Sequence, residues 1–163
     1  MARNVVVTDI DLGYDAIIEE IVKLEKASLL VGIQEQAKTT AQTKNGRTQK
    51  AGQSVAEYAA QNEFGTNKIP ERSFMRTAFD ENLDLIENAT ADQYGKIIDG
   101  DIALTQGLNV IGQIITGLIQ TKIRAIVFPP NSPATIAMKG SSKPLIDFGQ
   151  MVKSVTYAIR TKK

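Results

Sequence analysis

The segment NEFGTNKIPERSFMR, residues 62–76, decides the fold of this chain. Gly65 suits the left-handed backbone conformation that follows the last turn of a helix. Pro70 then fixes the backbone of a short link, because its ring locks one of the two soft dihedral angles. A second helix is predicted to begin near Phe74, whose aromatic side chain we expect to be buried. No side chain here is typical of a catalyst, so we interpret the segment as a joint of the kind found in proteins that assemble.

Helices are predicted on both sides of this joint. The first begins after Ser54, which fits a capping box with Glu57, and it extends to Phe64. The second is predicted over residues 74–88. Its expected inward side chains are Phe74, Ala78, Phe79 and Leu85, and its expected solvated side chains are Asp80, Glu81, Asp84 and Glu87. These acids could bind a divalent metal, but a solvated helix face is the better interpretation because no pairing ligand lies elsewhere.

A long helix, roughly Ile102 to Val127, is predicted to form the spine of the core. Its apolar side chains recur at steps of three and four along one stripe. The stripe consists of Leu104, Leu108, Ile111, Ile115 and Leu118, widened by Val110, Ile114 and Ile123. Three glycines, Gly107, Gly112 and Gly117, recur every five residues and therefore do not share a face.

Shorter elements lie toward the two ends of the chain. Residues 14–26 are typical of an amphipathic helix, and residues 28–33 and 154–160 of strands. After Pro129-Pro130, Ser132 is expected to cap a short helix that ends at Gly140. The sequence thus predicts a single α+β domain, residues 1–163. A small, mostly antiparallel sheet would pack against several helices, with a long central helix and a long flexible loop.

The predicted flexible loop spans residues 34–53. It is polar and shows no periodicity, and Asn45-Gly46 is typical of a hairpin turn. Its cations are Lys38, Lys44, Arg47 and Lys50, opposed only by Glu35. We expect these four cations to contact a partner protein or DNA.

Composition excludes several classes of function. The 163 residues contain neither histidine nor cysteine, which removes the commonest general base, the thiol nucleophile and most zinc or iron sites. The formal net charge of +1 provides no overall attraction to nucleic acid or membrane. The N-terminus lacks the apolar run of a signal peptide, and the most apolar segment, residues 102–126, contains too many polar side chains for a membrane span. We therefore expect no enzyme activity and no catalytic, cofactor or metal site.

Two short motifs have a chemical and a structural interpretation. Asp147-Phe148-Gly149 matches the metal-binding tripeptide of protein kinases, but the other kinase motifs are missing. We expect Asp147 to accept hydrogen bonds from backbone amides in a turn. The segment Lys139–Lys143 lacks the spacing of a phosphate-binding loop and is interpreted as a helix C-terminus with a glycine cap. A small hydrolase would need Asp99, Asp101 and Asp147 to cluster in one pocket.

Charge is unevenly distributed along the chain. Residues 120–163 contain eight lysines and arginines against one aspartate, a net charge of +7. Residues 71–101 contain eight acids against three bases, a net charge of −5. The two segments could pair within one domain, or they could join copies head to tail and generate a closed ring.

Three blocks of sequence carry a resemblance to a known family. They are EFGT (63–66) with IPERSFMR (69–76), PPNSPATI (129–136) with KGS (139–141), and PLIDFGQM (144–151) with SVTY (154–157). In the same order, they resemble the EFGT…IPARPFLR, PPLSPxTIxxKGS and PLIDTGQLxxSIxY motifs of the tail-completion and head–tail joining proteins of long-tailed bacteriophages. Ser73 and Phe148 stand where that family has proline and threonine, and Ser73 could cap its helix.

The resemblance implies a ring, with six copies expected, at the phage neck. Its partners would be other copies of the chain, neighbouring neck proteins and tail-tube proteins, with DNA passing through the lumen without sequence readout. The chain would reach the virion after assembly in the host cytoplasm, and it would have no catalytic role. The family positions are Phe64, Gly65, Pro70, Arg72, Phe74, Arg76, Pro130, Thr135, Lys139, Pro144, Leu145, Asp147 and Gly149. Arg72 is expected to hold the link between Gly65 and Pro70 through a bidentate bond to a carboxylate or to carbonyls.

Three other functions stay open from the sequence. The first two are a tail terminator and a minor tail protein, which are also structural proteins of the phage tail. A non-virion DNA-binding protein is a different class, which the unpaired cations of the predicted loop would serve.

Overall fold

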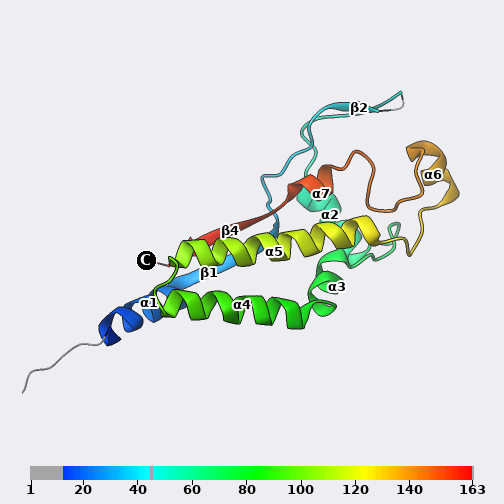
Figure 1. Ribbon diagram of the computed structural model, residues 1–163. Helices are drawn as coiled ribbons and strands as arrows, with labels where there is room; N and C mark the ends of the chain where they lie inside the picture. Colours follow the sequence, from blue (N-terminus) through cyan, green and yellow to red (C-terminus); the bar gives the residue numbers. More distant parts are fainter. Residues whose placement is uncertain (1–12, 45, 163) are drawn as a thin grey trace, which may run out of the picture.

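The computed structural model describes residues 13–44 and 46–162 (Figure 1). The elements follow in the order α1 (Tyr14–Lys26), β1 (Ala27–Ile33), β2 (Gln42–Lys44), β3 (Arg47–Gln49), α2 (Val55–Phe64), α3 (Phe74–Asp80), α4 (Leu83–Ile98), α5 (Leu104–Ala125), α6 (Pro133–Lys139), α7 (Gln150–Ser154) and β4 (Val155–Thr161). This mixture of helices with antiparallel strands confirms the predicted α+β class.

The long helix α5 is the spine of the molecule. The sheet formed by β1 and β4 packs against it on one side, and α3 and α4 pack against it elsewhere (Figure 1). The buried side of α5 consists of Gly107, Leu108, Ile111, Gly112, Ile115, Ile119 and Ile123, at helical steps of three and four. The predicted stripe is therefore confirmed along most of its length, but Val110 is exposed and Ile119 rather than Leu118 lies in the core.

Two glycines let neighbouring elements approach α5 closely. A Cβ atom added at Gly107 would lie 2.6 Å from the Ile97 side chain of α4, and one added at Gly112 would lie 2.5 Å from the Tyr157 ring of β4. Gly117 has no such neighbour within 4 Å. As expected from their spacing, the glycines face different directions. Gly107 allows close packing of α4, and Gly112 allows close packing of β4.

The strands β1 and β4 form an antiparallel ladder of seven residue pairs, from Ala27↔Thr161 to Ile33↔Val155. One face packs on the core through alternate side chains, among them Leu29, Val31 and Ile159. The opposite face is open, and Leu30 at its centre is 46% exposed. Within the described residues the sheet has only these two strands.

The helix predicted over residues 74–88 is two helices. It ends at Asp80, and α4 begins at Leu83 and continues to Ile98. The side chain of Asn82 donates a hydrogen bond of 2.8 Å to the Ala78 carbonyl, a local bond that competes with continuation of the helix. The direction of α4 therefore does not follow from α3, and Leu85, predicted to face inward, is 48% exposed.

The polar segment 34–53 contains a short hairpin. Strands β2 and β3 pair from Gln42↔Gln49 to Lys44↔Arg47 and confirm the predicted hairpin, although the turn residue Asn45 lies outside the described residues. At the base of the segment, buried Thr39 donates to the Lys50 carbonyl at 2.7 Å and accepts from the Gln53 amide at 3.1 Å.

Helix α1 has the predicted bounds, but no residue in it is buried. It lies at one end of the molecule and contacts α4 and α5 (Figure 1). Its apolar side chains Ile17, Ile18 and Val22 remain 38–41% exposed. Across residues 13–44 and 46–162, every helix is too short or too polar to cross a lipid bilayer.

Candidate functional site

The three sequence blocks come together at the end of the molecule away from α1. There the joint of residues 62–76 lies near the segment around α6, and the hairpin β2–β3 projects from the same end of the molecule (Figure 1). Arg47 connects the hairpin to this region. Five polar side chains from these segments, which we call the polar node, connect them: Arg47, Arg72, Asn131, Lys139 and Asp147.

Arg72 joins the first block to the second. Its side chain is 6% exposed, and it donates from Nε to the Pro129 carbonyl at 2.7 Å and from Nη2 to the Pro130 carbonyl at 3.1 Å. Nη1 donates to Asn62 Oδ1 at 3.3 Å. Burial lowers the pKa of Arg72, as expected where water is excluded from a cation. The predicted bidentate bond to carbonyls is confirmed, but it holds a segment 57 residues away rather than the adjacent link.

Glu63 fixes the second half of the joint. The carboxylate is 5% exposed, and its two oxygens accept from the Met75 amide at 2.8 Å and the Arg76 amide at 3.0 Å. These amides belong to the first turn of α3, where backbone N–H groups lack helical partners and the dipole favours negative charge. Glu63 therefore caps α3 from the preceding helix. The expectation that Ser73 would do so is wrong, because Ser73 makes no capping bond and its hydroxyl pairs with Thr77.

Gly65 allows the sharp exit from α2. Its φ is 73° and its ψ is 170°, a conformation essentially restricted to glycine and different from the left-handed helical one that we predicted. A Cβ atom here would also lie 3.0 Å from the Glu71 amide nitrogen. The joint thus requires glycine both for its backbone angles and for its space.

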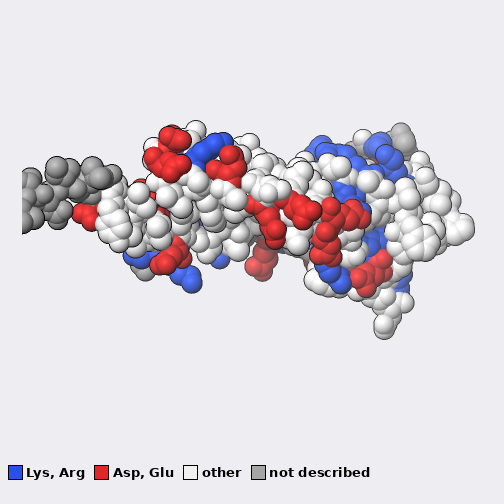
Figure 2. Space-filling view, turned by 60° about the horizontal axis from the view of Figure 1, so that its bottom comes forward, with Lys and Arg blue, Asp and Glu red and all other residues white. Residues whose placement is uncertain are grey.

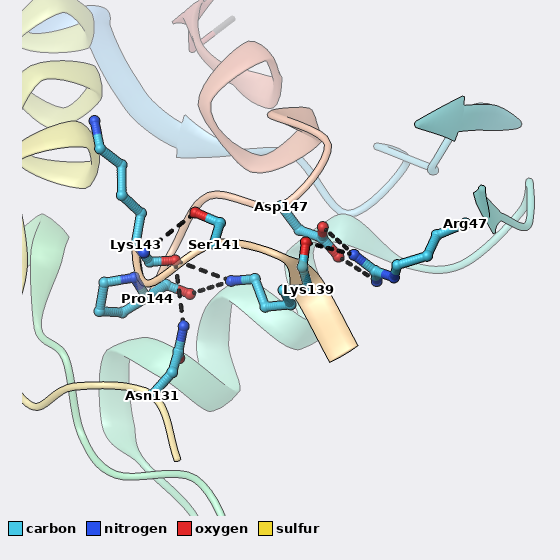
Figure 3. Close-up of polar contacts among 7 residues, drawn as sticks. All are labelled: Arg47, Asn131, Lys139, Ser141, Lys143, Pro144 and Asp147. Atoms are coloured by element: carbon cyan, nitrogen blue, oxygen red, sulfur yellow. Dashed lines mark hydrogen bonds and ion pairs between the residues drawn. The ribbon is translucent and has the colours of Figure 1, made fainter. Parts of the chain in front are cut away.

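Lys139 and Asn131 hold the turn between the second and third blocks (Figure 3). Lys139 Nζ donates to the carbonyls of Lys143 and Pro144, each at 3.0 Å, and Asn131 donates to the Lys143 carbonyl at 3.3 Å. Burial lowers the pKa of Lys139, against an opposing effect of Asp147. Gly140 adopts the predicted left-handed cap after α6, and Ser132 caps the start of that helix through the Thr135 amide.

Asp147 pairs with the hairpin. Arg47 donates to its two carboxylate oxygens at 2.8 and 3.0 Å and to the Lys139 carbonyl at 3.2 Å (Figure 3). The Arg47 guanidinium also lies 5.4 Å from the centroid of the Phe148 ring, within the range of a cation–π contact. The predicted role of Asp147, bonding amides in its own turn, is therefore wrong. Arg47 is likewise bound within the chain, whereas Lys38, Lys44 and Lys50 remain exposed without ion pairs among the described residues.

The remaining family positions divide into buried and exposed groups. Phe74 and Leu145 are buried, Pro70 and Pro130 line a surface groove beside Arg72, and Gly149 directly precedes α7 with a left-handed φ of 75°. Phe64 is 70% exposed, and Arg76 forms an exposed pair with Glu71. The structure therefore places these two at the surface and the others in or beside the joint.

Sequence reasoning missed three partners: Asn62, Glu63 and Asn131. Each acts on a segment at least ten residues away, so no local spacing indicates its role. The one available signal was the position of Glu63 in the last turn of a helix that ends before Gly65, where the helix dipole disfavours an acid. Within residues 13–44 and 46–162, no three His, Cys, Asp or Glu residues are grouped in a way that could hold a metal ion.

The polar node holds three chain segments against one another. Its hydrogen-bond donors bind backbone carbonyls and one carboxylate. Comparisons with protein-family models, with curated proteins and with solved structures found no match.

Proposed function

We propose that this chain is a structural virion protein of a phage neck. In this proposal it forms a ring of six copies that completes the tail and joins it to the head, with DNA passing through the lumen. The chain acts through shape and surface contacts, and it makes or breaks no covalent bond.

The observation that carries the proposal is the convergence of the three blocks. The first block is far in sequence from the other two, yet Arg72 joins it to the second. Lys139 joins the second block to the third, which follows it closely in sequence, and Arg47 joins Asp147 of the third block to the hairpin. A resemblance spread over three blocks gains weight when the blocks form one connected unit. Most of these hydrogen bonds are donated to backbone carbonyls, as expected in a structural protein whose conformation is fixed.

The charge distribution supports contact between copies. Lys122 and Glu81 form the one ion pair, among described residues, between the acidic segment 71–101 and the basic segment 120–162. Figure 2 shows acidic side chains spread along the face that carries α3 and α4. Other charges are exposed and form no ion pair among the described residues: Asp80, Asp84 and Glu87 of the first segment, and Arg124, Lys153 and Arg160 of the second. These charges are available to neighbouring molecules, which favours the head-to-tail alternative.

Particles assembled without this chain provide the test. We expect filled heads and finished tails that fail to join, seen separately by negative-stain electron microscopy, and restoration of joined particles when the purified protein is added. Complete and infectious particles in its absence would refute the proposal.

The DNA-binding alternative rests on Lys38, Lys44 and Lys50. Binding of duplex DNA by the isolated chain at micromolar concentration, with the steep salt dependence of phosphate contacts, would favour that alternative. Our proposal expects weak binding without sequence preference.

A further inference from the structure

Among the described residues, the sheet formed by β1 and β4 leaves both of its edges unpaired. A two-stranded ladder is marginal by itself, and here it is supported by α5 on one face only. No other strand of the described chain pairs with either edge.

The pattern of hydrogen bonds between β1 and β4 shows which backbone groups point away from the partner strand. Lys162 donates its amide to the Lys26 carbonyl at 2.9 Å, and in an antiparallel pair the bonded residues alternate. The backbone groups of Leu29 and Val31 on β1, and of Tyr157 and Ile159 on β4, therefore point away from the ladder. None of them takes part in a hydrogen bond found in the described structure.

The edge of β1 also lacks the usual protection. Its sequence ASLLVGI contains no charged residue and no proline, the two devices that commonly block edge pairing. A groove of about 590 Å³ lies on the open face of the sheet, where Leu30 and Gly32 of β1 and Thr156, Ala158 and Arg160 of β4 line it. No strand of the described chain occupies the β1 edge next to this face.

We propose that β1 of one copy pairs antiparallel with β4 of the next copy, so that the sheets join into one continuous sheet around the ring. This inference rests on the proposed ring and names its interface. Each copy has one β1 edge and one β4 edge. In a closed ring of heterologous contacts, every β1 edge would pair with the β4 edge of a neighbouring copy.

The two edges differ in charge. β1 carries no charged side chain, whereas β4 carries Arg160, is followed by Lys162 and is preceded by Lys153 of α7. Two β4 edges placed antiparallel would bring Lys153 close to Arg160 and Lys162 of the other copy, and like charges oppose that contact. The basic edge of β4 can therefore meet the uncharged edge of β1 without the repulsion that opposes a second β4 edge.

Cysteine cross-linking tests the contact, since the chain contains no native cysteine. One preparation carries Leu30→Cys and a second carries Ala158→Cys, so a disulfide can form only between molecules. Across the proposed interface these positions face each other as a non-hydrogen-bonded pair, whose Cα separation suits a disulfide. We expect dimers containing one chain of each kind after mixing and mild oxidation. Repeating the mixture with Thr156→Cys or Arg160→Cys detects a register shifted by two residues.

A blocking variant supplies the second measurement. Leu30→Lys places a charge on the open face, and Leu83→Lys makes the same change at an exposed position on α4. We expect the first variant to shift the mass measured by light scattering from the ring to the monomer with an unchanged melting temperature, and the second to leave the ring intact.

The outcomes separate this inference from the proposed function. Rings that persist in Leu30→Lys and give no mixed disulfide would overturn the β1–β4 interface while leaving the ring itself standing. Disulfides only between identical chains, or a wild-type chain that stays monomeric at millimolar concentration, would also overturn the interface. The neck role is decided independently by particles assembled without the chain.

Discussion

The polar node and the opposite end of the molecule are stabilised in different ways. In the node, charged side chains with little exposure bind backbone groups from distant segments, as Arg72 does with Pro129 and Pro130. At the other end, helix α1 buries no residue and one face of the β1–β4 sheet is open. This difference is the basis of our proposal that the open side of the sheet contacts other copies. Substitutions on that open side should therefore act on assembly, whereas substitutions in the node or in the packed core should act on stability.

The largest effect is expected at the node. Arg72→Ala leaves the Pro129 and Pro130 carbonyls without donors in a site of low exposure, and we expect a loss of about 3 kcal/mol in the free energy of unfolding. Arg76→Ala is the matched control, because that arginine belongs to the same motif but forms only an exposed pair with Glu71. Chemical denaturation of both variants measures the difference. Equal losses would contradict the assignment of Arg72 as the central bond.

A glycine in α5 tests the packing of the sheet end. A Cβ atom at Gly112 would overlap the Tyr157 ring, so Gly112→Ala should destabilise the chain by about 2 kcal/mol through overpacking. Gly117→Ala in the same helix meets no atom within 4 Å and should stabilise it by up to about 1 kcal/mol, because alanine favours helix. Thermal unfolding should therefore shift in opposite directions for the two variants. A shift in the same direction would mean that α5 does not approach β4 as described.

The cap on α3 should give an effect of intermediate size. Glu63→Gln removes the charge that faces two amides at the start of α3, and we expect a loss of about 1 kcal/mol. Glu57→Gln, on the same helix but exposed, should change stability little, since no hydrogen bond to its carboxylate is found in the described residues. Denaturation midpoints compare the two, and amide exchange at Met75 and Arg76 should accelerate only in the Glu63 variant.

The smallest effect concerns Tyr58, which lies beneath the node. Burial, with a smaller contribution from Asp147, raises its pKa from 10.0 to about 12. The unfolded chain therefore loses this proton first, so stability present below pH 10 should be lost as the pH rises toward 12. Absorbance of the phenolate should show one late-titrating tyrosine, absent in Tyr58→Phe. Stability of that variant should fall less steeply over the same interval, and an identical pH dependence would contradict the burial of the phenol.

Local patterns were sufficient for most elements. The stripe on α5, the serine caps of α2 and α6 and the alternation in β4 each arise within a few residues, and the structure confirms them. At the Ser54 cap, however, only half of the predicted capping box forms: Ser54 accepts from Glu57, and no return bond from the Glu57 side chain occurs among described residues.

Long-range pairing could not be predicted in the same way. Arg47 and Asp147 are 100 residues apart, and both were assigned other roles from their immediate neighbours. The break at Asn82 was missed because the apolar periodicity continues through it, while the deciding bond is made by one side chain to the Ala78 carbonyl. Sequence therefore identified the residues of the joint, but only the fold shows which segments they hold.

Negative-stain imaging of the purified chain mixed with tail tubes tests the central claim most directly. The account predicts annular particles, alone or seated at one end of each tube, with a central opening wide enough for duplex DNA. Tubes with bare ends and no annulus at any protein concentration would contradict it.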